Sequence, residues 1–328
     1  MCLVALAIDH SRRFPLVIAA NRDEFFKRPT ARLAWWTPEG GGPAILSGRD
    51  LDGGGTWMGL TAEGRLALVT NVRDPKRNDP GAPSRGLIVP DWLAAADRTD
   101  RFWMRTALSG YNAFNLVAFD FRRGECFWAS NNGDYPVRLE RGVHGLSNAK
   151  LDTPWPKVDV LKARLDDAIA EAPGVDALSM RLFDALSDRS EAPDERLPET
   201  GVPLEWERRL SAAFIRTPDA AYGTRCSTLV ITEKVNRHLV THVLERSFSA
   251  TGVALLRRST LKNWPPRYSL DAGAAQPASE PAEVAEAELV ADAATTAELQ
   301  AAAKRVRVRS LLKPDPSRRR RRTMPMPL

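Results

Sequence analysis

The chain has 328 residues, of which 43% are hydrophobic and 27% charged, so it can bury the core of one large domain or two small ones. No segment approaches the roughly 20 apolar residues of a membrane span, and the most apolar run, Met1–Ile8, lacks a basic leader. We therefore expect no transmembrane segment, no secretory signal and a cytoplasmic location. Cys2, Cys126 and Cys226 show neither CxxC nor Cys/His spacing, which excludes a disulfide scaffold and a zinc site.

The net charge of +6 is unevenly distributed. Residues 271–300 hold seven acidic and no basic residues, whereas residues 301–328 hold ten Lys and Arg against Asp315 alone. The remaining +4 lies in residues 1–270 without forming a basic stripe, so we do not expect a nucleic-acid-binding protein. The run Arg318–Arg322 reads as a solvated tail, with a nucleic-acid or anionic-membrane contact as the alternative.

Short apolar runs separated by turn residues predict β-strands over most of the first 270 residues. In chain order, the expected strands are Cys2–Ile8, Leu16–Asn21, Thr56–Thr61, Arg65–Asn71, Phe114–Phe121, Glu125–Ser130, Tyr135–Glu140, Val143–Ser147, Ser227–Glu233 and His238–Arg246. The first two, the next two and the last two pair as hairpins. His238 and His242 share a strand face about 13 Å apart, too far to bind one metal ion. We expect no metal and no cofactor.

Helical periodicity is confined to three places. Ser84 is positioned to cap a helix that continues through Leu93, and apolar spacing predicts further helices over Trp155–Ala170 and Val175–Leu186. Many antiparallel strands with few helices indicate an α+β fold. From residue 271 onward Ala, Pro and Glu dominate and aromatic residues vanish, which predicts a domain over 1–270 and a mostly disordered tail over 271–328.

Cys2 is the first candidate for chemistry. Removal of Met1 would leave it as the amino terminus, with an α-amine of pKa near 7.7–8.0 beside a thiol of pKa about 8.5. One residue would then supply both the nucleophile and the base. The alternative is a small buried side chain in a core strand.

The tetrad Asn21-Arg22-Asp23-Glu24 follows an apolar strand directly. If the strand continues, Asn21 and Asp23 lie on one face and Arg22 and Glu24 on the other. A hairpin with Cys2–Ile8 brings Asn21 and Asp23 beside the amino terminus. A salt bridge with a turn cap at the strand end is the alternative.

Several short motifs occur in order along roughly residues 1–265. They are Met1-Cys2-Leu3, Asn21-Arg22-Asp23-Glu24, Gly54-Gly55-Thr56-Trp57-Met58-Gly59, Leu68-Val69-Thr70-Asn71-Val72-Arg73, Ser84-Arg85-Gly86, His144-Gly145-Leu146-Ser147-Asn148 and Leu151-Asp152-Thr153-Pro154-Trp155-Pro156-Lys157. In this order they resemble the NRDE family, also called the transport and Golgi organisation 2 family. That family is similar to the N-terminal-nucleophile hydrolases, notably the cysteine branch that contains penicillin V acylase and bile salt hydrolase.

The resemblance implies a four-layer αββα sandwich of antiparallel sheets with Cys2 at the end of a central strand. It also implies that Asp23 contacts the nucleophile's amine, that Asn71 and Asn148 face the oxyanion, and that Arg225 completes the site. The supporting residues are Asn21, Arg22, Glu24 and Trp57. Turn capping is the alternative for both asparagines, a surface ion pair for Arg225, and core packing for Trp57.

One position departs from the amidase pattern, because Ala20 stands where that branch carries an arginine. Two functions follow. The first is a cysteine amidohydrolase that acts on a small or lipid-like amide. The second is a non-catalytic carrier that uses the same pocket for haem or an acyl lipid, as proposed for the family together with a role in secretory-pathway organisation. Cys2 with two matched asparagines favours the enzyme, and Ala20 favours the carrier. The sequence does not determine the oligomeric state.

Overall fold

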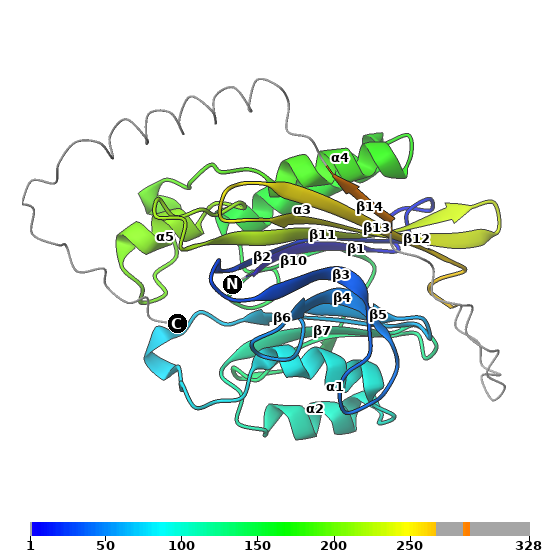
Figure 1. The fold of residues 1–328 in the computed structure, drawn as a ribbon, viewed down its shortest axis with the longest axis horizontal. Coiled ribbons are helices and arrows are strands. Elements are labelled where there is room, and N and C mark those ends of the chain that lie inside the picture. Colours follow the sequence, from blue (N-terminus) through cyan, green and yellow to red (C-terminus); the bar gives the residue numbers. More distant parts are fainter. Residues whose placement is uncertain (1, 267–284, 289–328) are drawn as a thin grey trace, which may run out of the picture.

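Two seven-stranded antiparallel sheets form the centre of the molecule (Figure 1). The structure, a computed structural model, describes residues 2–266 and 285–288. The first sheet has the order β10-β1-β2-β11-β12-β13-β14, and the second has the order β3-β4-β5-β6-β7-β8-β9. The strands are β1 (Cys2–Ile8), β2 (Leu16–Phe25), β3 (Thr30–Trp36), β4 (Ile45–Asp50), β5 (Met58–Thr61), β6 (Arg65–Asn71), β7 (Phe114–Asp120), β8 (Glu125–Ser130), β9 (Asp134–Arg138), β10 (Gly142–Leu146), β11 (Tyr222–Val235), β12 (His238–Phe248), β13 (Ala254–Lys262) and β14 (Ala285–Glu288).

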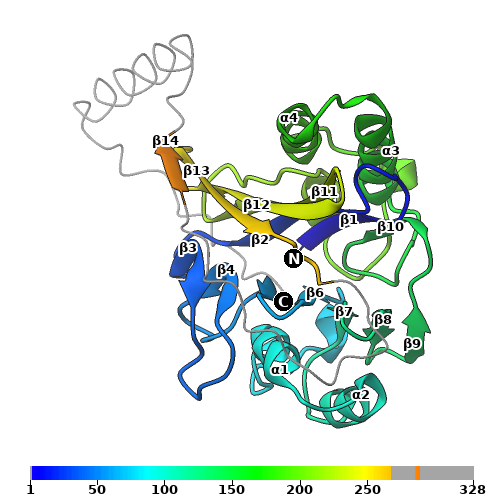
Figure 2. The same cartoon turned by 90° about the vertical axis from the view of Figure 1, so that its right-hand side faces the viewer.

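Helices cover the outer face of each sheet, which completes four layers (Figure 2). The helices are α1 (Ile88–Ala94), α2 (Thr99–Ala107), α3 (Pro156–Glu171), α4 (Val175–Leu186) and α5 (Leu204–Leu210), with short 3₁₀ turns η1 (Pro75–Arg77), η2 (Arg85–Leu87) and η3 (Asp194–Arg196). Helices α3 and α4 lie over the first sheet, and α1 and α2 lie over the second (Figure 1). The expected α+β class and αββα sandwich are confirmed.

The alternation of side chains along β1 explains how one strand serves two cores. Leu3 and Ala5 pack in the cluster that includes α3 and α4, whereas Val4 and Leu6 pack between the two sheets. Because successive side chains of a strand point to opposite faces, a strand buried on both sides is apolar throughout. Burial of these two faces fixes the register of β1, since a slip of one residue would exchange them.

The hairpin of β1 and β2 forms as expected, and β2 is longer than expected. Cys2 pairs with Arg22 and Leu3 with Asn21. The strand runs on to Phe25, so the whole tetrad 21–24 is strand. It is paired on its other side by β11, where Thr224 lies opposite Asp23.

Several elements differ from the expectation. Strands β3, β4 and β13 and helices α2 and α5 were not predicted, since polar residues interrupt their apolar patterns. Ser84 makes no side-chain capping hydrogen bond; it precedes the turn η2, and α1 begins only at Ile88. The expected capping by Ser84 was therefore wrong.

The predicted tail is described only in part. Residues 285–288 form β14, which pairs with β13 through Leu255–Arg258. The rest of 271–328, with the run Arg318–Arg322, lies outside the described residues, so the division at residue 270 stays a prediction. Among the described residues, no helix has the length and apolar character needed to cross a membrane.

Candidate functional site

The register of three strands defines the surroundings of Cys2. On one side Cys2 pairs with Arg22 of β2. On the other side β10 pairs with β1 up to Val4 opposite Leu146. β10 ends at Leu146, and Asn148 follows two residues later on this side of β1. The first residue of the central strand β1 therefore lies between the tetrad and Asn148.

Asn21 links β2 to the layer of helices. Its Nδ2 donates to the carbonyl oxygens of Leu186 and Ala213, each at 2.8 Å, and its Oδ1 accepts from Ser227 Oγ at 2.6 Å. Leu186 is the last residue of α4, where helix carbonyls lack partners within the helix. The buried Asn21 amide thus holds the C-terminal end of α4 against the sheet.

Arg22 and Glu24 lie on the opposite face of β2, as the period of two predicts. The guanidinium of Arg22 stacks 4.5 Å from the ring of Trp57, which directly precedes β5 of the second sheet, and its Nη2 lies 3.5 Å from Asp50 of β4. Glu24 lies 3.7 Å from Arg22 and 3.9 Å from Arg28. The tetrad thus has one face against the helices and a charged face toward the second sheet.

Asp23 is a buried carboxyl group, 1% exposed. Its Oδ1 accepts a hydrogen bond of 2.7 Å from Thr224 Oγ1, which itself accepts the Ile215 N–H at 2.9 Å. Burial raises the pKa of Asp23, while the charges of Lys157 and Arg22 and the Thr224 hydrogen bond act in the opposite direction. A buried carboxyl group adjacent to positive charge is suited to holding an ammonium group nearby.

Asn71 and Asn148 meet although 77 positions separate them in the sequence. Asn148 Nδ2 donates to the Asn71 carbonyl oxygen at 2.8 Å, and the Arg73 N–H donates to the Asn148 carbonyl oxygen at 2.8 Å. Thr70 Oγ1 adds a bond of 2.7 Å to the carbonyl oxygen of Ser147. An amide nitrogen carries two N–H groups, so Asn148 retains one for a ligand.

Asp152 anchors the loop that carries Asn148. Its carboxylate accepts from the Gly145 N–H at 2.8 Å, lies 3.1 Å from His144 Nδ1, and also pairs with Lys162. Burial alone would raise the pKa of Asp152, but hydrogen bonds from His144, Lys162 and Gly145 lower it to about 2. The hydrogen bond with Asp152 also raises the pKa of His144. The loop is therefore held by an ionised carboxylate at neutral pH.

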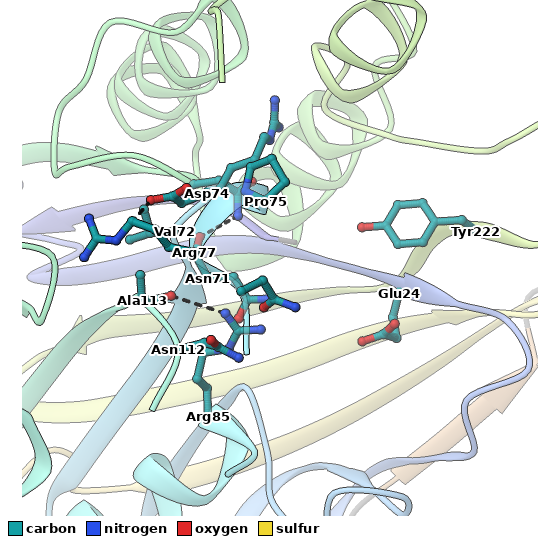
Figure 3. A pocket seen from close by; sticks show the side chains of 13 residues that line it. Glu24, Asn71, Val72, Asp74, Pro75, Arg77, Arg85, Asn112, Ala113 and Tyr222 are labelled. Atoms are coloured by element: carbon teal, nitrogen blue, oxygen red, sulfur yellow. Dashed lines mark hydrogen bonds and ion pairs between the residues drawn. The ribbon is translucent and has the colours of Figure 1, made fainter. Parts of the chain in front are cut away.

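A cleft opens beside these residues. Its wide part has a volume of about 430 Å³ and is lined by Arg22, Asp23, Glu24, Trp57 and Asn71, among others. Its narrow part, about 50 Å³, includes Asn71, Arg73, Asn148 and Tyr222. Figure 3 shows Tyr222 and Glu24 on one side of the narrow part, with Asn71 and Arg85 on the other. Asn71 and Glu24 line both parts, so the two form one continuous cleft.

Arg225 occupies a different position. It lies at the β-bulge between Thr224 and Cys226, and its Nη1 donates to the carbonyl oxygens of Phe25 and Arg28 at 2.7 and 2.9 Å. Burial lowers the pKa of Arg225, and the charge of Arg22 acts in the same direction. In this structure Arg225 holds the turn after β2, and its part in a reaction stays a prediction.

Ala20 packs between the sheets with 7% of its surface exposed. Arg22 contacts Trp57 and Asp50, and the Arg49 guanidinium stacks 4.7 Å from the ring of Trp36, so both of these arginines already have partners. The position of Ala20 is thus part of the apolar core.

Arg73 is a site residue that sequence reasoning missed. It follows β6, lines the narrow part of the cleft, and its Nη1 lies 2.6 Å from Glu207 of α5. Thr224 and the buried Lys157 were also missed as neighbours of Asp23. All three lie within the quoted motifs or beside Arg225. For Arg73, the available signal was a charged residue that closely follows the buried strand β6.

The described part of the chain holds no group of three or more His, Cys, Asp or Glu side chains arranged to bind a metal ion.

The architecture defines the class of protein. An αββα sandwich of two antiparallel sheets in which residue 2 begins a central strand is the fold of N-terminal-nucleophile-like proteins. The profile of the Transport and Golgi organisation 2 family matches residues 1–250. The chain belongs to this family, which confirms the resemblance drawn from its motifs.

Curated relatives agree with this assignment. The chain is 31% identical over 255 residues to the Transport and Golgi organization 2 homolog of Mus musculus, covering 73% of this chain and 91% of that protein. The Bos taurus homolog is 33% identical, covering 71% and 89%, and the Drosophila melanogaster protein is 27% identical, covering 72% and 89%. Among solved structures, a Caenorhabditis elegans N-acylethanolamine-hydrolyzing acid amidase ortholog matches with a TM-score of 0.41 at 10% identity, covering 70% of this chain and 92% of that chain.

Proposed function

We propose that this protein is a cysteine amidohydrolase whose nucleophile is Cys2 after removal of Met1. The observation that carries the proposal is the position of Cys2. It begins β1 opposite Arg22 of β2, and the neighbouring strand β10 ends two residues before Asn148, at the end of the sheet where the cleft opens. A small or lipid-like amide is the proposed substrate.

The proposed reaction has two halves. The α-amine takes the proton of the Cys2 thiol, and the thiolate attacks the amide carbonyl carbon, forming a C–S bond. The tetrahedral intermediate collapses with cleavage of the C–N bond, and the α-ammonium gives its proton to the leaving nitrogen. Water then attacks the thioester; its proton passes through the amine to sulfur, and a carboxylic acid leaves.

Asn71, Asn148 and Asp23 have distinct roles in this proposal. The free N–H of Asn148 and the side-chain amide of Asn71 face the oxyanion, and each such donor contributes roughly 2.7–4 kcal/mol. The hydrogen bond from Asn148 to the Asn71 carbonyl oxygen holds the two residues in one arrangement. Asp23 orients the ammonium form of the amine by its charge.

Intact mass measurement of the purified full chain tests the proposal. We expect a mass without Met1 and, after incubation with a panel of acyl amides, an adduct equal to one acyl group on Cys2. Retention or acetylation of Met1 would overturn the proposal, because Cys2 can act as its own base only with a free amine.

A carrier function is the second candidate, and the apolar packing of Ala20 favours it. The amidase branch carries a cation at that position, whereas here a methyl group packs between the sheets. The same cleft would then hold haem or an acyl lipid without turnover. Tight binding of either ligand by a protein that is never acylated would decide for this candidate.

A further inference from the structure

Arg73 has more hydrogen-bond donors than its surroundings satisfy. Its side chain is 3% exposed, and its Nη1 pairs with Glu207 at 2.6 Å. Its guanidinium also stacks 4.9 Å from the ring of Trp155. Within the described residues, Nε and Nη2 have no hydrogen-bond partner although both are buried. No other described arginine has two such atoms.

These two nitrogen atoms are costly to leave unsatisfied. A buried donor without a partner loses its hydration without compensation, and the loss is greater for a charged group, so such atoms in a native protein call for a ligand or another explanation. Glu207 does not supply the missing acceptor, because its Oε1 accepts from the Thr200 N–H and Oγ1 at 2.9 and 2.5 Å. The carboxylate of Glu207 is thus shared between Thr200 and one edge of Arg73.

The geometry of the two atoms indicates what they bind. Nε and Nη2 lie on the same edge of the planar guanidinium and point in parallel, which matches the two oxygens of a carboxylate. Arg73 lines the narrow part of the cleft together with Asn71, Asn148 and a second arginine, Arg85. That part has a volume of about 50 Å³ and suits a small polar group, since about 10–15 Å³ of such space is enough to hold one water molecule.

We propose that the narrow part of the cleft binds a carboxylate of the ligand through Nε and Nη2 of Arg73. The ligand is an N-acyl amino acid or a similar amide with a carboxylate close to its amide bond; its identity as an amide rests on the proposed function. The carboxylate occupies the narrow part and the acyl group extends into the wide part. Arg73 is a specificity-determining residue in this arrangement.

The test compares two probes of equal acyl length, N-octanoylglycine and N-octanoylethanolamine. Calorimetry on the full chain with Cys2→Ala measures binding without turnover. We expect N-octanoylglycine to bind at least about 10-fold more tightly. Its carboxylate would accept two charge-assisted hydrogen bonds from Nε and Nη2 of Arg73, which otherwise lack partners. Equal affinities for the two probes would overturn the proposal.

Variants separate binding from stability. Arg73→Gln alone leaves Glu207 buried without its cation, so the folded test variant is Arg73→Gln with Glu207→Gln, in the Cys2→Ala chain. We expect it to lose about 10–100-fold in affinity for N-octanoylglycine and nothing for N-octanoylethanolamine. Glu207→Gln alone is the control. It keeps the guanidinium and removes its counter-charge, so the affinity for N-octanoylglycine should be retained or increased.

The outcomes distinguish this proposal from the proposed function. If Glu207→Gln weakens N-octanoylglycine binding as much as the double variant, Arg73 has only a structural role and the proposal fails. If Cys2 of the wild-type chain is acylated by N-octanoylethanolamine and not by N-octanoylglycine, the function stands and the carboxylate proposal fails. Arg73-dependent binding of N-octanoylglycine without acylation by either probe supports the ligand class and overturns the amidohydrolase.

Discussion

An arginine lies at each end of strand β6, and the two differ in how many of their guanidinium nitrogens have hydrogen-bond partners. Arg65 begins the strand and stacks 4.8 Å from the ring of Trp92; Arg73 follows its end and stacks 4.9 Å from Trp155. Arg65 donates from Nε and Nη2 to Asp120 at 3.1 and 2.9 Å, and from Nη1 to the carbonyl oxygens of Trp92 and Ala95. Arg73 uses only Nη1 on an acceptor of the protein, the carboxylate of Glu207 in α5.

The difference separates scaffold from site. At the Arg65 end, Nε and Nη2, which have no partner in Arg73, donate to the carboxylate of Asp120. That end ties β6 to β7 and to α1, and no further ligand is needed there. At the other end Asn71, Arg73 and Asn148 line the narrow part of the cleft, and Nε and Nη2 of Arg73 have no partner among the described residues. Two unsatisfied nitrogens on one edge of a buried guanidinium require an explanation, and the proposed ligand carboxylate supplies one at this end of β6.

The largest expected effect lies at the cleft end, at Cys2. Cys2→Ser should reduce acylation and turnover by more than about 10³-fold, because a hydroxyl group is a far weaker nucleophile than a thiol at neutral pH. Affinity for the same ligand should barely change. Paired kinetics and calorimetry measure both quantities. Unchanged turnover in Cys2→Ser would end the assignment of the nucleophile, whatever the state of Arg73.

Asn71→Ala should have the next largest effect. Loss of one oxyanion donor is expected to lower turnover by roughly 10²–10³-fold while sparing ground-state binding. Asn115→Ala is a matched control from the neighbouring strand β7, since Asn115 bonds Thr70 and the carbonyl oxygen of Ala149 and does not line the cleft. Equal losses of turnover in both variants would indicate a general loosening of the strand ends.

The Arg65 end should respond in stability instead. The Arg65 side chain is 12% exposed and that of Asp120 6%, so Arg65→Gln leaves a nearly buried carboxylate with only the more distant Arg123, at 3.8 Å, as a cation. We expect the free energy of unfolding to fall by about 3 kcal/mol. Urea unfolding measures the loss, and acylation of the remaining folded protein should be unchanged. A change in ligand affinity would show that the two ends of β6 are coupled.

Much of the scaffold followed from local pattern. Strand β1 was predicted to the residue, and the period of two placed Arg22 and Glu24 on the face opposite Asn21. Local pattern did not find β3, where Arg32 interrupts the apolar run, or α2, whose exposed face carries Met104. These elements are fixed by packing against distant strands.

The sequence predicted only those site residues that lie within its motifs or match the family pattern. Asp23, Asn71 and Asn148 came from the resemblance to the family, and the structure brings them to one strand end. The partners that give them their environment are far away in sequence: Thr224 lies 201 positions from Asp23, and Glu207 lies 134 from Arg73. No pattern along the chain reports such contacts, so the unsatisfied edge of Arg73 was visible only in three dimensions.

The smallest expected effect concerns the loop that brings Asn148 to the cleft end of β6. Asp152 holds this loop, and its pKa of about 2 is below its ordinary value of 3.8. A carboxylate with a lowered pKa in the folded state contributes stability that is present above pH 4 and is lost as the pH falls through 2. Because its side chain is one-third exposed, solvent screening reduces this contribution to about 1 kcal/mol.

Asp152→Asn tests this contribution through urea unfolding between pH 6 and pH 2.5. We expect the variant to be about 1 kcal/mol less stable at pH 6 and the difference from the wild type to shrink as the pH falls below 4. Asp166→Asn is the exposed control, because the Asp166 side chain is 57% exposed and should contribute little at any pH. A difference that stays constant down to pH 2.5 would mean that the Asp152 side chain acts by its shape and not by its charge. The loss of stability at acidic pH would then not arise at this loop. The stability of the cleft end of β6 would not depend on the ionisation of Asp152.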